Sequence, residues 1–458
     1  MAIRKSKNNS LPSANKDEKL FAALDVGGSK LRLACGYVNS DKDVTILGFL
    51  EGPSAGIVNG SISDLNALAQ CIGSLIQNFQ NSFHITISDI VVGVPGCYIN
   101  AQNQHGTATI QTGTVTLADR NAAINSAKAG VNVKIDEDFT TIHLIPQNYR
   151  TESSNLVENP IGMFAKRLDV NVHIIGCNTL YMKNIENALK MASRDIYMKT
   201  PIYEGLAASN AVLFDSEIEI GVIHIDIGSG CVSVTVFEGK RQLLSFGISD
   251  GGDYITRFIA KAFGISPADA EYLKCNYGKA SYKLLQPEEY DEVLPTPSEK
   301  GASGNQITKV ALCSYINRAL VNMVDLIIQK VVSYCGESFD KLTIGSGVVL
   351  TGGTAKLQGI EYVFSERLRS RAEDPTCRFL NISSKVRIGH PIKLSMYENA
   401  GDRVAVSDTD KAVLIGLLRS ARFEDLNQYD NQAPKEKIAK GFVGRIIQRA
   451  KVWADREL

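Results

Sequence analysis

The sequence lacks the paired spacings with which proteins usually build disulfide frameworks or zinc sites. It has no C-x-x-C pair and no H-E-x-x-H, and its six histidines are scattered. The nine cysteines stand singly between Cys35 and Cys377. Because an odd and dispersed set suits reduced thiols better than a disulfide framework, we expect a protein of the cytosol.

An excess of charge and a long apolar stretch are also missing. Lys and Arg together number 49, as do Asp and Glu, so the net charge is zero and no global field attracts nucleic acid. No apolar run approaches the roughly 20 residues that span a bilayer. Residues 1–19 are polar and lack the apolar core of a signal peptide, so we expect them to form a disordered tail.

Two common nucleotide-binding signatures are absent as well. The P-loop pattern G-x-x-x-x-G-K-[ST] occurs nowhere in the chain. The run Gly228-Ser229-Gly230 begins like a dinucleotide fingerprint, but the residues that follow it include no third glycine. Any nucleotide site in this protein must therefore be built differently.

What the sequence does contain is one pattern that occurs twice. Residues Phe21–Val38 read FAALDVGGSKLRLACGYV, and residues Gly221–Gly239 read GVIHIDIGSGCVSVTVFEG. In each, an apolar run leads to Asp-x-Gly and then to an alternating run, which predicts a strand, a tight turn and a second strand. The two aspartates, Asp25 and Asp226, lie 201 positions apart, so we expect two related halves.

The chemistry of the repeated turn indicates a phosphate site. Glycine accepts positive φ and lets backbone N–H groups approach an anion closely. An aspartate beside such a turn is explained when a cation such as Mg²⁺ lies between carboxylate and phosphate, directly or through water. One Asp-x-Gly turn alone is commonplace and is usually without function. The matched pair favours two halves that bind one nucleotide phosphate chain between them.

Two segments of the second half offer backbone or carboxylate groups to the same site. Gly352-Gly353-Thr354 follow an apolar strand and precede a helix, where backbone amides can bind a nucleotide. An ordinary turn between strand and helix has the same pattern. Glu204 begins a helix of small residues, where it either orients a water for attack on a phosphate or only favours the helix dipole.

A charged pair is a further candidate. Glu271 and Lys274 lie at i and i+3 in PADAEYLKCNYG, which places them on one face of a helix. There they either bracket a ribose and base or form an exposed ion pair worth about 0.3 kcal/mol. Taken alone, the exposed pair is the more usual explanation.

The C-terminal segment 435–458 has the pattern of a helix that lies on a membrane surface. At 100° per residue its apolar side chains fall on one half of the wheel and its basic side chains on the other half or at the border. A polar linker, residues 422–434, precedes it. A core-packing helix is the alternative, but the basic rim, the linker and the terminal position favour anionic lipid. The residues expected at the membrane are Ile438, Phe442, Val443, Ile446, Ile447 and Trp453, with Lys440, Arg445, Arg449 and Lys451.

Helical and strand patterns alternate along the rest of the chain, so the expected fold class is α/β. The 458 residues suffice for two or three domains with substantial cores. The expected division is 20–88 with 172–200 as a first large subdomain, 89–171 as an inserted subdomain, 201–245 with 345–421 as a second large subdomain, and 246–344 as a second small subdomain.

Taken in order, these segments resemble the actin, Hsp70 and sugar-kinase superfamily, and within it the FtsA family of bacterial cell-division proteins. The two Asp-x-Gly hairpins resemble the phosphate-1 and phosphate-2 loops, PIYEGLAASNAVL the helix that connects the halves, and VVLTGGTAKLQGI the adenosine loop. The segment with IPQNYR and NPIGMFAKRLDVNVHII resembles the inserted, SHS2-like subdomain of that family. The resemblance covers about Leu20 to Leu418 and the tail. It implies an actin-like ATPase fold with two duplicated halves around a nucleotide cleft, and a C-terminal amphipathic helix.

The resemblance implies ATP and Mg²⁺ as cofactors. Asp25 and Asp226 would hold the metal, directly or through water, and Glu204 would orient the attacking water in a slow hydrolysis. The nucleotide-binding residues would be Gly27, Gly28, Ser29, Lys30, Gly228, Ser229, Gly230, Gly251, Gly252, Asp253, Glu271, Lys274, Gly352, Gly353 and Thr354.

The second phosphate loop departs from the family's pattern. FtsA-like loops commonly continue Gly-Gly-Thr-Thr-Asp, whereas this chain continues Ser229-Gly230-Cys231-Val232-Ser233. The hydroxyls that are lost at Cys231 and Val232 would help to position water or phosphate. We therefore expect ATP binding to persist on backbone amides and Mg²⁺, and hydrolysis to be weakened.

The resemblance also implies a function and its partners. The protein would polymerise like actin, tether FtsZ filaments to the cytoplasmic face of the bacterial membrane at the division septum, and help to recruit other division proteins. Its second small subdomain would receive the C-terminal peptide of FtsZ. Two alternatives on the same fold are a pilus-assembly ATP-binding protein and a small-molecule phosphotransferase. A kinase should also present a carboxylate base near the γ-phosphate, and no such signature stands out.

Overall fold

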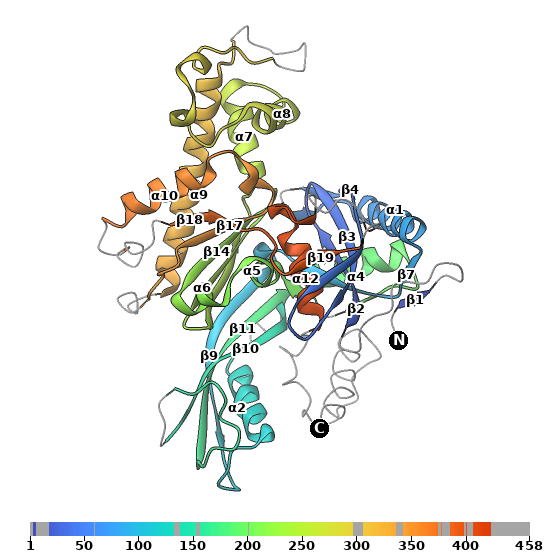
Figure 1. Ribbon diagram of the computed structural model, residues 1–458, viewed down its shortest axis with the longest axis vertical. Coiled ribbons are helices and arrows are strands. Elements are labelled where there is room, and N and C mark those ends of the chain that lie inside the picture. The colour runs from blue at the N-terminus through green and yellow to red at the C-terminus, as the bar shows by residue number, and fades with distance from the viewer. Residues whose placement is uncertain are drawn as a thin grey trace.

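The computed structural model describes residues 3–5, 18–58, 60–131, 138–152, 156–199, 201–295, 306–335, 342–373, 377, 385–397, 400 and 406–422 (Figure 1). Most of the expected N-terminal tail, residues 1–19, lies outside these residues. So do the linker beyond residue 422 and the whole segment 435–458, with every residue expected at the membrane.

The predicted duplication is present as two sheets of one design (Figure 1). In each sheet three antiparallel strands form a meander, and further strands add in parallel beside the meander's first strand. The first sheet contains, in order, β12 (Tyr197–Met198), β8 (Asp89–Val94), β2 (Lys19–Val26), β3 (Lys30–Val38), β4 (Val44–Pro53) and β19 (Leu394–Met396), with β13 (Ile202–Tyr203) also paired to β8. The second contains β16 (Arg241–Ile248), β15 (Val232–Glu238), β14 (Val222–Ile227), β17 (Val348–Thr351) and β18 (Val386–Ile388).

The central strands are largely buried because helices cover the sheets. All six residues of β14 are buried, as expected for a strand that is covered on both faces. Helix α1 (Leu65–Phe83) packs on β3 and β4, and α4 (Thr179–Ala192) packs on α1. The Asp64 side chain caps α1 by accepting from two backbone N–H groups. The helix ends at His84, whose φ is 54°.

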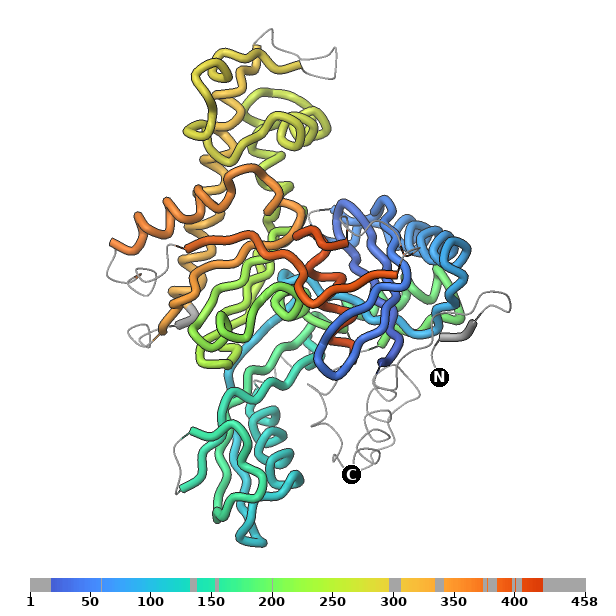
Figure 2. Tube along the Cα trace, in the orientation of Figure 1, coloured from blue at the N-terminus to red at the C-terminus, as the bar shows by residue number. Residues whose placement is uncertain are grey.

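Two helices meet at the centre of the molecule. Helix α5 (Glu204–Val212) follows β13, and α12 (Ala412–Arg422) packs against α5 and β2 although it is the last described helix of the chain (Figure 2). Their backbones approach closely at Gly416, where a Cβ atom would lie 1.8 Å from the carbonyl oxygen of Ala207. Only glycine fits there without displacing one helix.

We therefore expect Gly416→Ala to lower the free energy of unfolding by about 1–3 kcal/mol, because overpacking outweighs the better helix propensity of alanine. Gly73→Ala is the matched control. Gly73 also lies inside a helix, but a Cβ there would be 3.4 Å from its nearest neighbour, an ordinary contact. Chemical denaturation of both variants checks the prediction, and equal stabilities would show that the two helices separate without cost.

The inserted subdomain extends from the first sheet at the lower end of the molecule (Figure 1). It consists of β9 (Ile99–Thr109), α2 (Leu117–Ala129), β10 (Phe139–Thr151) and β11 (Arg167–Asn178), and α2 covers the sheet β10-β11-β9. The sequence-based boundaries of 89–171 differ from this arrangement at both ends. Strand β8 belongs to the first sheet because it pairs with β2, and β11 continues to Asn178 because it pairs along its length with β9.

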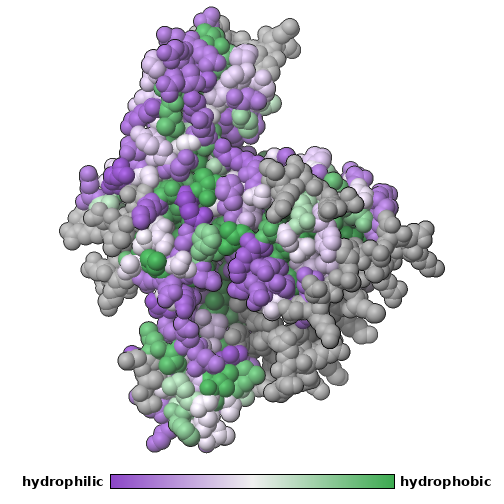
Figure 3. All heavy atoms as spheres, viewed as in Figure 1, coloured by the Kyte–Doolittle hydropathy of each residue, from purple (hydrophilic) through white to green (hydrophobic). Residues whose placement is uncertain are grey.

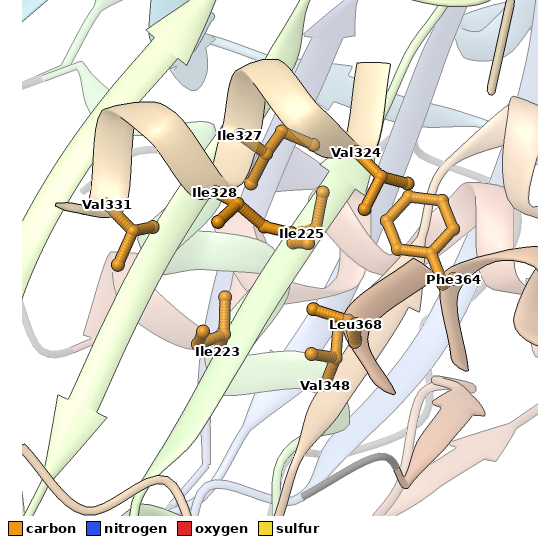
Figure 4. Close-up of a pocket in the computed structure, with 9 residues that line it drawn as sticks. All are labelled: Ile223, Ile225, Val324, Ile327, Ile328, Val331, Val348, Phe364 and Leu368. Atoms are coloured by element: carbon orange, nitrogen blue, oxygen red, sulfur yellow. The ribbon is translucent and has the colours of Figure 1, made fainter. Parts of the chain in front are cut away.

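The second small subdomain occupies the upper end with α7 (Gly252–Phe263), α8 (Pro267–Tyr277) and the first part of α9 (Lys309–Cys335) (Figure 1). Helix α9 continues down to the second sheet, where α10 (Ile360–Arg371) also packs. The expected range of 246–344 therefore assigns the whole of α9 to the small subdomain, although the helix also packs on the second sheet. Its second part packs on β14 and β17 (Figure 4).

Helix α9 also corrects the prediction that no stretch approaches the length of a membrane span. Its residues Lys309–Ser333 are long and apolar enough, with a mean hydropathy of 1.3, but half of the most apolar window is buried inside the protein. The helix is apolar because it packs on the second sheet. A void of about 10 Å³ remains in this packing, too small and too apolar for a polar ligand. The residues around it are Ile223, Ile225, Val324, Ile327, Ile328, Val331, Val348, Phe364 and Leu368 (Figure 4).

The chain returns to the first half before the described residues end. Strand β19 pairs in parallel with β4, and α12 contacts β2, β3 and β8. Residues 394–422 therefore belong structurally to the first half, and not to the second large subdomain that was expected to include 345–421. This return is a long-range pairing that no local sequence signal marks.

The remaining elements are short. They are β1 (Ile3–Lys5) paired with β7 (Ile85–Ile87), β5 (Ile57–Val58) paired with β6 (Ser61–Ile62), α6 (Asp215–Ile220), and the 3₁₀ turns η1 (Gly96–Tyr98), η2 (Tyr282–Leu284), η3 (Pro287–Glu289), η5 (Gly353–Lys356) and η7 (Thr409–Lys411).

Candidate functional site

The two Asp-x-Gly turns, far apart in sequence, are in contact in the structure. Asp25 is the penultimate residue of β2, and Asp226 is the penultimate residue of β14. A Cβ atom on Gly28 would lie 2.8 Å from Oγ of Ser229 and 4.0 Å from the amide nitrogen of Gly230. The first turn therefore needs glycine so that the second can approach it. Asp25 and Asp226 occupy equivalent positions because the strands of the two meanders pair in the same way.

Three carboxylates lie buried around these turns. Asp25, Asp226 and Glu204 are each less than a tenth exposed. Burial, followed by the charges of Asp25 and Asp226, raises the pKa of Glu204 well above its ordinary value. Burial also raises the pKa of Asp226 to about 6, although a hydrogen bond from Thr351 acts in the opposite direction. The site thus holds more buried carboxylate than its own cations neutralise.

Asp25 is held by a charged cluster of the first half. The Arg32 guanidinium donates to Asp25 at 3.0 Å and to Asp410 at 3.1 Å. Lys411 also pairs with Asp410 at 2.8 Å, and with Glu51 at 3.4 Å. Burial still raises the pKa of Asp25, because the lost hydration outweighs the attraction of Arg32. No local sequence pattern marks Arg32 and Asp410 as partners, since 378 positions separate them.

Asp226 is oriented by a chain of hydrogen bonds within the second sheet. The Thr351 hydroxyl donates to Asp226 at 2.7 Å, and Nε2 of His224 lies 3.0 Å from the same hydroxyl. Burial lowers the pKa of His224 to about 3, so the ring is neutral and its Nε2–H donates to Thr351. Thr351 was not among the predicted site residues, although it directly precedes Gly352.

Glu204 reaches the site from the first residue of α5. The preceding Tyr203 fixes the start of this helix against the second sheet, because its hydroxyl donates to the carbonyl oxygens of Val234 at 2.9 Å and Phe246 at 3.2 Å. A Cβ atom on Gly93 would lie 2.8 Å from Cγ of Glu204, so the carboxylate passes directly over the end of β8. This position brings its charge near both aspartates.

The second turn is also joined to the start of α7. The amide of Gly252 donates to the carbonyl oxygen of Gly228 at 2.9 Å, and the amide of Asp253 donates to that of Ser229 at 2.8 Å. A Cβ atom on Gly251 would lie 2.3 Å from the carbonyl oxygen of Gly228. These contacts explain the glycines of this segment and place it beside the second turn.

The adenosine-loop segment and the charged pair of α8 meet at the same point. The Thr354 hydroxyl donates to the carbonyl oxygen of Gly228 at 3.2 Å. Lys274 pairs with Glu271 at 2.6 Å, and its Nζ also donates to the carbonyl oxygen of Gly252 at 3.2 Å. Since Lys274 is largely buried and bonded to another segment, the pair is more than an exposed surface contact. The space beside Gly353 is open, because a Cβ atom there would meet no described neighbour within 4 Å.

Lys30 and the membrane residues are the predicted residues that do not join this group. Lys30 pairs with Glu51 at 2.5 Å and its side chain is half exposed. The residues expected at the membrane lie outside the described part of the chain.

The buried carboxylates fit a metal ion that takes only some of its ligands from the protein. Among the described residues, no three His, Cys, Asp or Glu side chains are close enough to enclose a metal. Asp226 and Glu204 are nevertheless buried, and no cationic side chain in the described part of the chain is bonded to either. This donor set fits a Mg²⁺ that takes its other ligands from water and phosphate, which is how that ion is usually bound.

Comparison with protein families and known proteins agrees with this geometry. The family model "Cell division protein FtsA" matches residues 223–411, and the model "SHS2 domain inserted in FTSA" matches residues 96–176. The cell division protein FtsA of Escherichia coli K12 is 28% identical over 444 residues, which cover 96% of this chain and 99% of that protein. The FtsA protein of Neisseria meningitidis serogroup B is 28% identical with the same coverage.

A solved structure has the same fold. In a PilM–PilN type IV pilus biogenesis complex, the matched chain is 14% identical, with a TM-score of 0.59 over 87% of this chain and 97% of that one. At this identity the likeness concerns the fold alone. The predicted α/β, actin-like fold with an inserted SHS2 domain is confirmed.

Proposed function

Because this chain belongs to the FtsA family of cell-division proteins, we propose that it binds Mg–ATP between its two halves and tethers FtsZ filaments to the membrane. One observation carries the nucleotide part of the proposal. Two glycine turns from the two halves are in contact, and among the described residues no cationic side chain is bonded to Asp226 or Glu204, two of the three buried carboxylates beside them. The Mg²⁺ that accompanies a phosphate chain would supply positive charge beside these carboxylates, and backbone amides of the turns would bind the phosphates.

The contacts of the two turns and of α8 suggest where the phosphates and the adenosine of ATP would lie. Phosphates would lie against Gly27 to Ser29 of the first turn and Gly228 to Gly230 of the second. The adenosine would lie on the side of the second half, between the Glu271–Lys274 pair and the open space at Gly353. Because the ligand touches both halves, ATP would favour their closed arrangement and act as a conformational ligand.

Glu204 is proposed to orient the attacking water in a slow hydrolysis. Glu204→Gln keeps the size of the side chain but removes its capacity to accept a proton, so phosphate release should fall by about 10²–10⁴-fold. ATP binding should remain nearly intact. Glu186→Gln, a change in a surface ion pair of α4, is the control and should leave phosphate release unchanged. Rapid transfer to a small-molecule acceptor, but not to water, would instead favour a phosphotransferase.

The tether part of the proposal rests on the family and on the C-terminal segment. The second small subdomain would receive the FtsZ peptide, and the amphipathic segment 435–458 would bind anionic lipid. Together they would place the protein on the cytoplasmic face of the membrane at the division septum. Other division proteins would be recruited to the same assembly.

Self-association is proposed from the family and from the surface of the inserted subdomain. Figure 3 shows hydrophobic residues gathered on the surface at the lower end of the molecule. The Phe164 side chain is 81% exposed there. Exposed apolar surface of this kind marks interaction sites, which supports contact with further copies of the chain or with other proteins of the division assembly. The exposed large apolar residues of the subdomain are Leu117, Leu156, Ile161 and Phe164.

Co-sedimentation with anionic liposomes tests the function as a whole. We expect the full chain to pellet with liposomes, more strongly with ATP, and to carry FtsZ into the pellet. A pilus-assembly protein would leave FtsZ in the supernatant. Pelleting that is independent of both ATP and FtsZ would contradict the proposed tether.

A further inference from the structure

Cys97 and Cys231 are in contact across the boundary between the two halves. Cys97 lies in η1, where the chain leaves the first sheet, and Cys231 closes the second turn immediately before β15. The amide nitrogen of Cys97 donates to Sγ of Cys231 at 3.1 Å, and the two side chains are hydrogen-bonded to each other. This 3.1 Å contact and standard bond lengths place the two Cα atoms at most about 7.4 Å apart, a range that includes the usual separation in a disulfide.

The surrounding backbone holds this contact in place. The amide of Gly96 donates to the Ser233 hydroxyl at 3.0 Å. A Cβ atom on Gly247 would lie 1.9 Å from the carbonyl carbon of Gly96, so the chains from the two halves touch where both residues are glycine. Both cysteine residues are of intermediate exposure, and the Cys231 thiol is the more deeply buried of the two. They are thus neither buried in a core nor brought together by a mobile surface contact.

We propose that Cys97 and Cys231 form a reversible disulfide that locks the two halves together beside the nucleotide site, with a low-molecular-weight disulfide of the glutathione class as oxidant. The Cys97 thiolate attacks one sulfur of the oxidant, which releases one small thiol and leaves a mixed disulfide. The Cys231 thiolate then attacks the Cys97 sulfur and releases the second small thiol. Two protein thiols are oxidised, one small disulfide is reduced, and both protons leave on the released thiols.

The electrostatics of the pair support this order of attack. The Cys231 side chain lowers the pKa of the Cys97 thiol through their hydrogen bond, so Cys97 is the better nucleophile. The same bond and burial raise the pKa of Cys231 well above its ordinary value. When Cys97 has formed the mixed disulfide, its sulfur no longer accepts this hydrogen bond from Cys231. The Cys231 thiol can then lose its proton and attack the mixed disulfide.

The effect on the site follows from the position of Cys231. Its carbonyl oxygen accepts from the amide of Gly228 at 3.0 Å within the second turn, so a bond to Cys97 would restrain that turn as well as the two halves. Release of a nucleotide held between the turns requires the halves to separate. This consequence, unlike the disulfide itself, rests on the proposed nucleotide function.

Peptide mapping tests the bond directly. The full chain is incubated with oxidised glutathione, alkylated and digested. We expect a linked pair of peptides that contain Cys97 and Cys231, in wild type and in the control Cys71→Ser, which changes another partly exposed thiol. Cys231→Ser, which keeps the hydrogen-bond acceptor, should instead carry one glutathione at Cys97. Glutathione on the exposed Cys275 without any linked pair would overturn the proposal.

Nucleotide release tests the lock. A fluorescent ATP analogue bound before oxidation should dissociate more slowly by on the order of tenfold, and dithiothreitol should restore the original rate. Cys97→Ser should respond to neither treatment, and its thermal melting shows whether it is folded. A linked pair with an unchanged release rate would overturn the lock. If the reduced wild type binds no ATP, the proposed nucleotide function fails, whereas the mapping result stands by itself.

Discussion

Asp226→Ala should lower the affinity for ATP in the presence of Mg²⁺ by about a hundredfold or more. Loss of a group that holds or orients a metal typically costs up to that factor, and here the carboxylate would also balance the metal beside a polyphosphate. The Asp226 carboxylate is buried and accepts a hydrogen bond from Thr351, which fixes its position in the site. Isothermal titration calorimetry with Mg²⁺ and with a chelator measures the effect.

Two further variants separate the role of the carboxylate from general damage. Thr351→Val keeps the carboxylate but removes the hydrogen bond that orients it, together with the acceptor of His224, so we expect a smaller loss of about tenfold. Asp250→Ala removes an exposed carboxylate of the same half, paired with Arg257, and should leave ATP affinity unchanged. Unchanged affinity in Asp226→Ala would remove the second turn from the proposed phosphate site.

The sequence was sufficient to predict the parts of this site that depend on local signals. Asp25 and Asp226 each end an apolar run and precede glycines, a pattern that a strand followed by a tight turn imposes on a short segment. Matched local patterns also predicted the duplication, because each half builds the same meander.

The parts that could not be predicted depend on contacts between distant segments. Arg32 joins Asp25 to Asp410, and no local pattern relates positions 32 and 410. The return of β19 and α12 to the first half is of the same kind. Helix α9 was misjudged for a different reason: burial against a sheet and insertion in a bilayer select similar apolar compositions. Only the packing distinguishes them.

Replacing Phe442 and Trp453 together with glutamate should abolish co-sedimentation with anionic liposomes while ATP binding persists. Each large apolar side chain contributes about 1.5–3 kcal/mol if it is fully buried, so the pair accounts for up to about 3–6 kcal/mol. This is roughly a 10²–10⁴-fold change in membrane partitioning, before the repulsion of the new charges from anionic lipid. Polymerisation places many tails on one surface, so the loss should be largest where avidity operates.

The matched control replaces Phe442 and Trp453 with leucine, which keeps the apolar face and should retain most of the pelleting. High salt should weaken the wild type only in part, since screening reduces the contribution of Lys440, Arg445 and the other basic residues but not the apolar term. In a monomeric form, the same tail should bind weakly, because ordering the helix and linker offsets much of the burial. Were the glutamate variant to pellet as well as the wild type, segment 435–458 would not be the anchor, and another surface would have to hold the protein on the membrane.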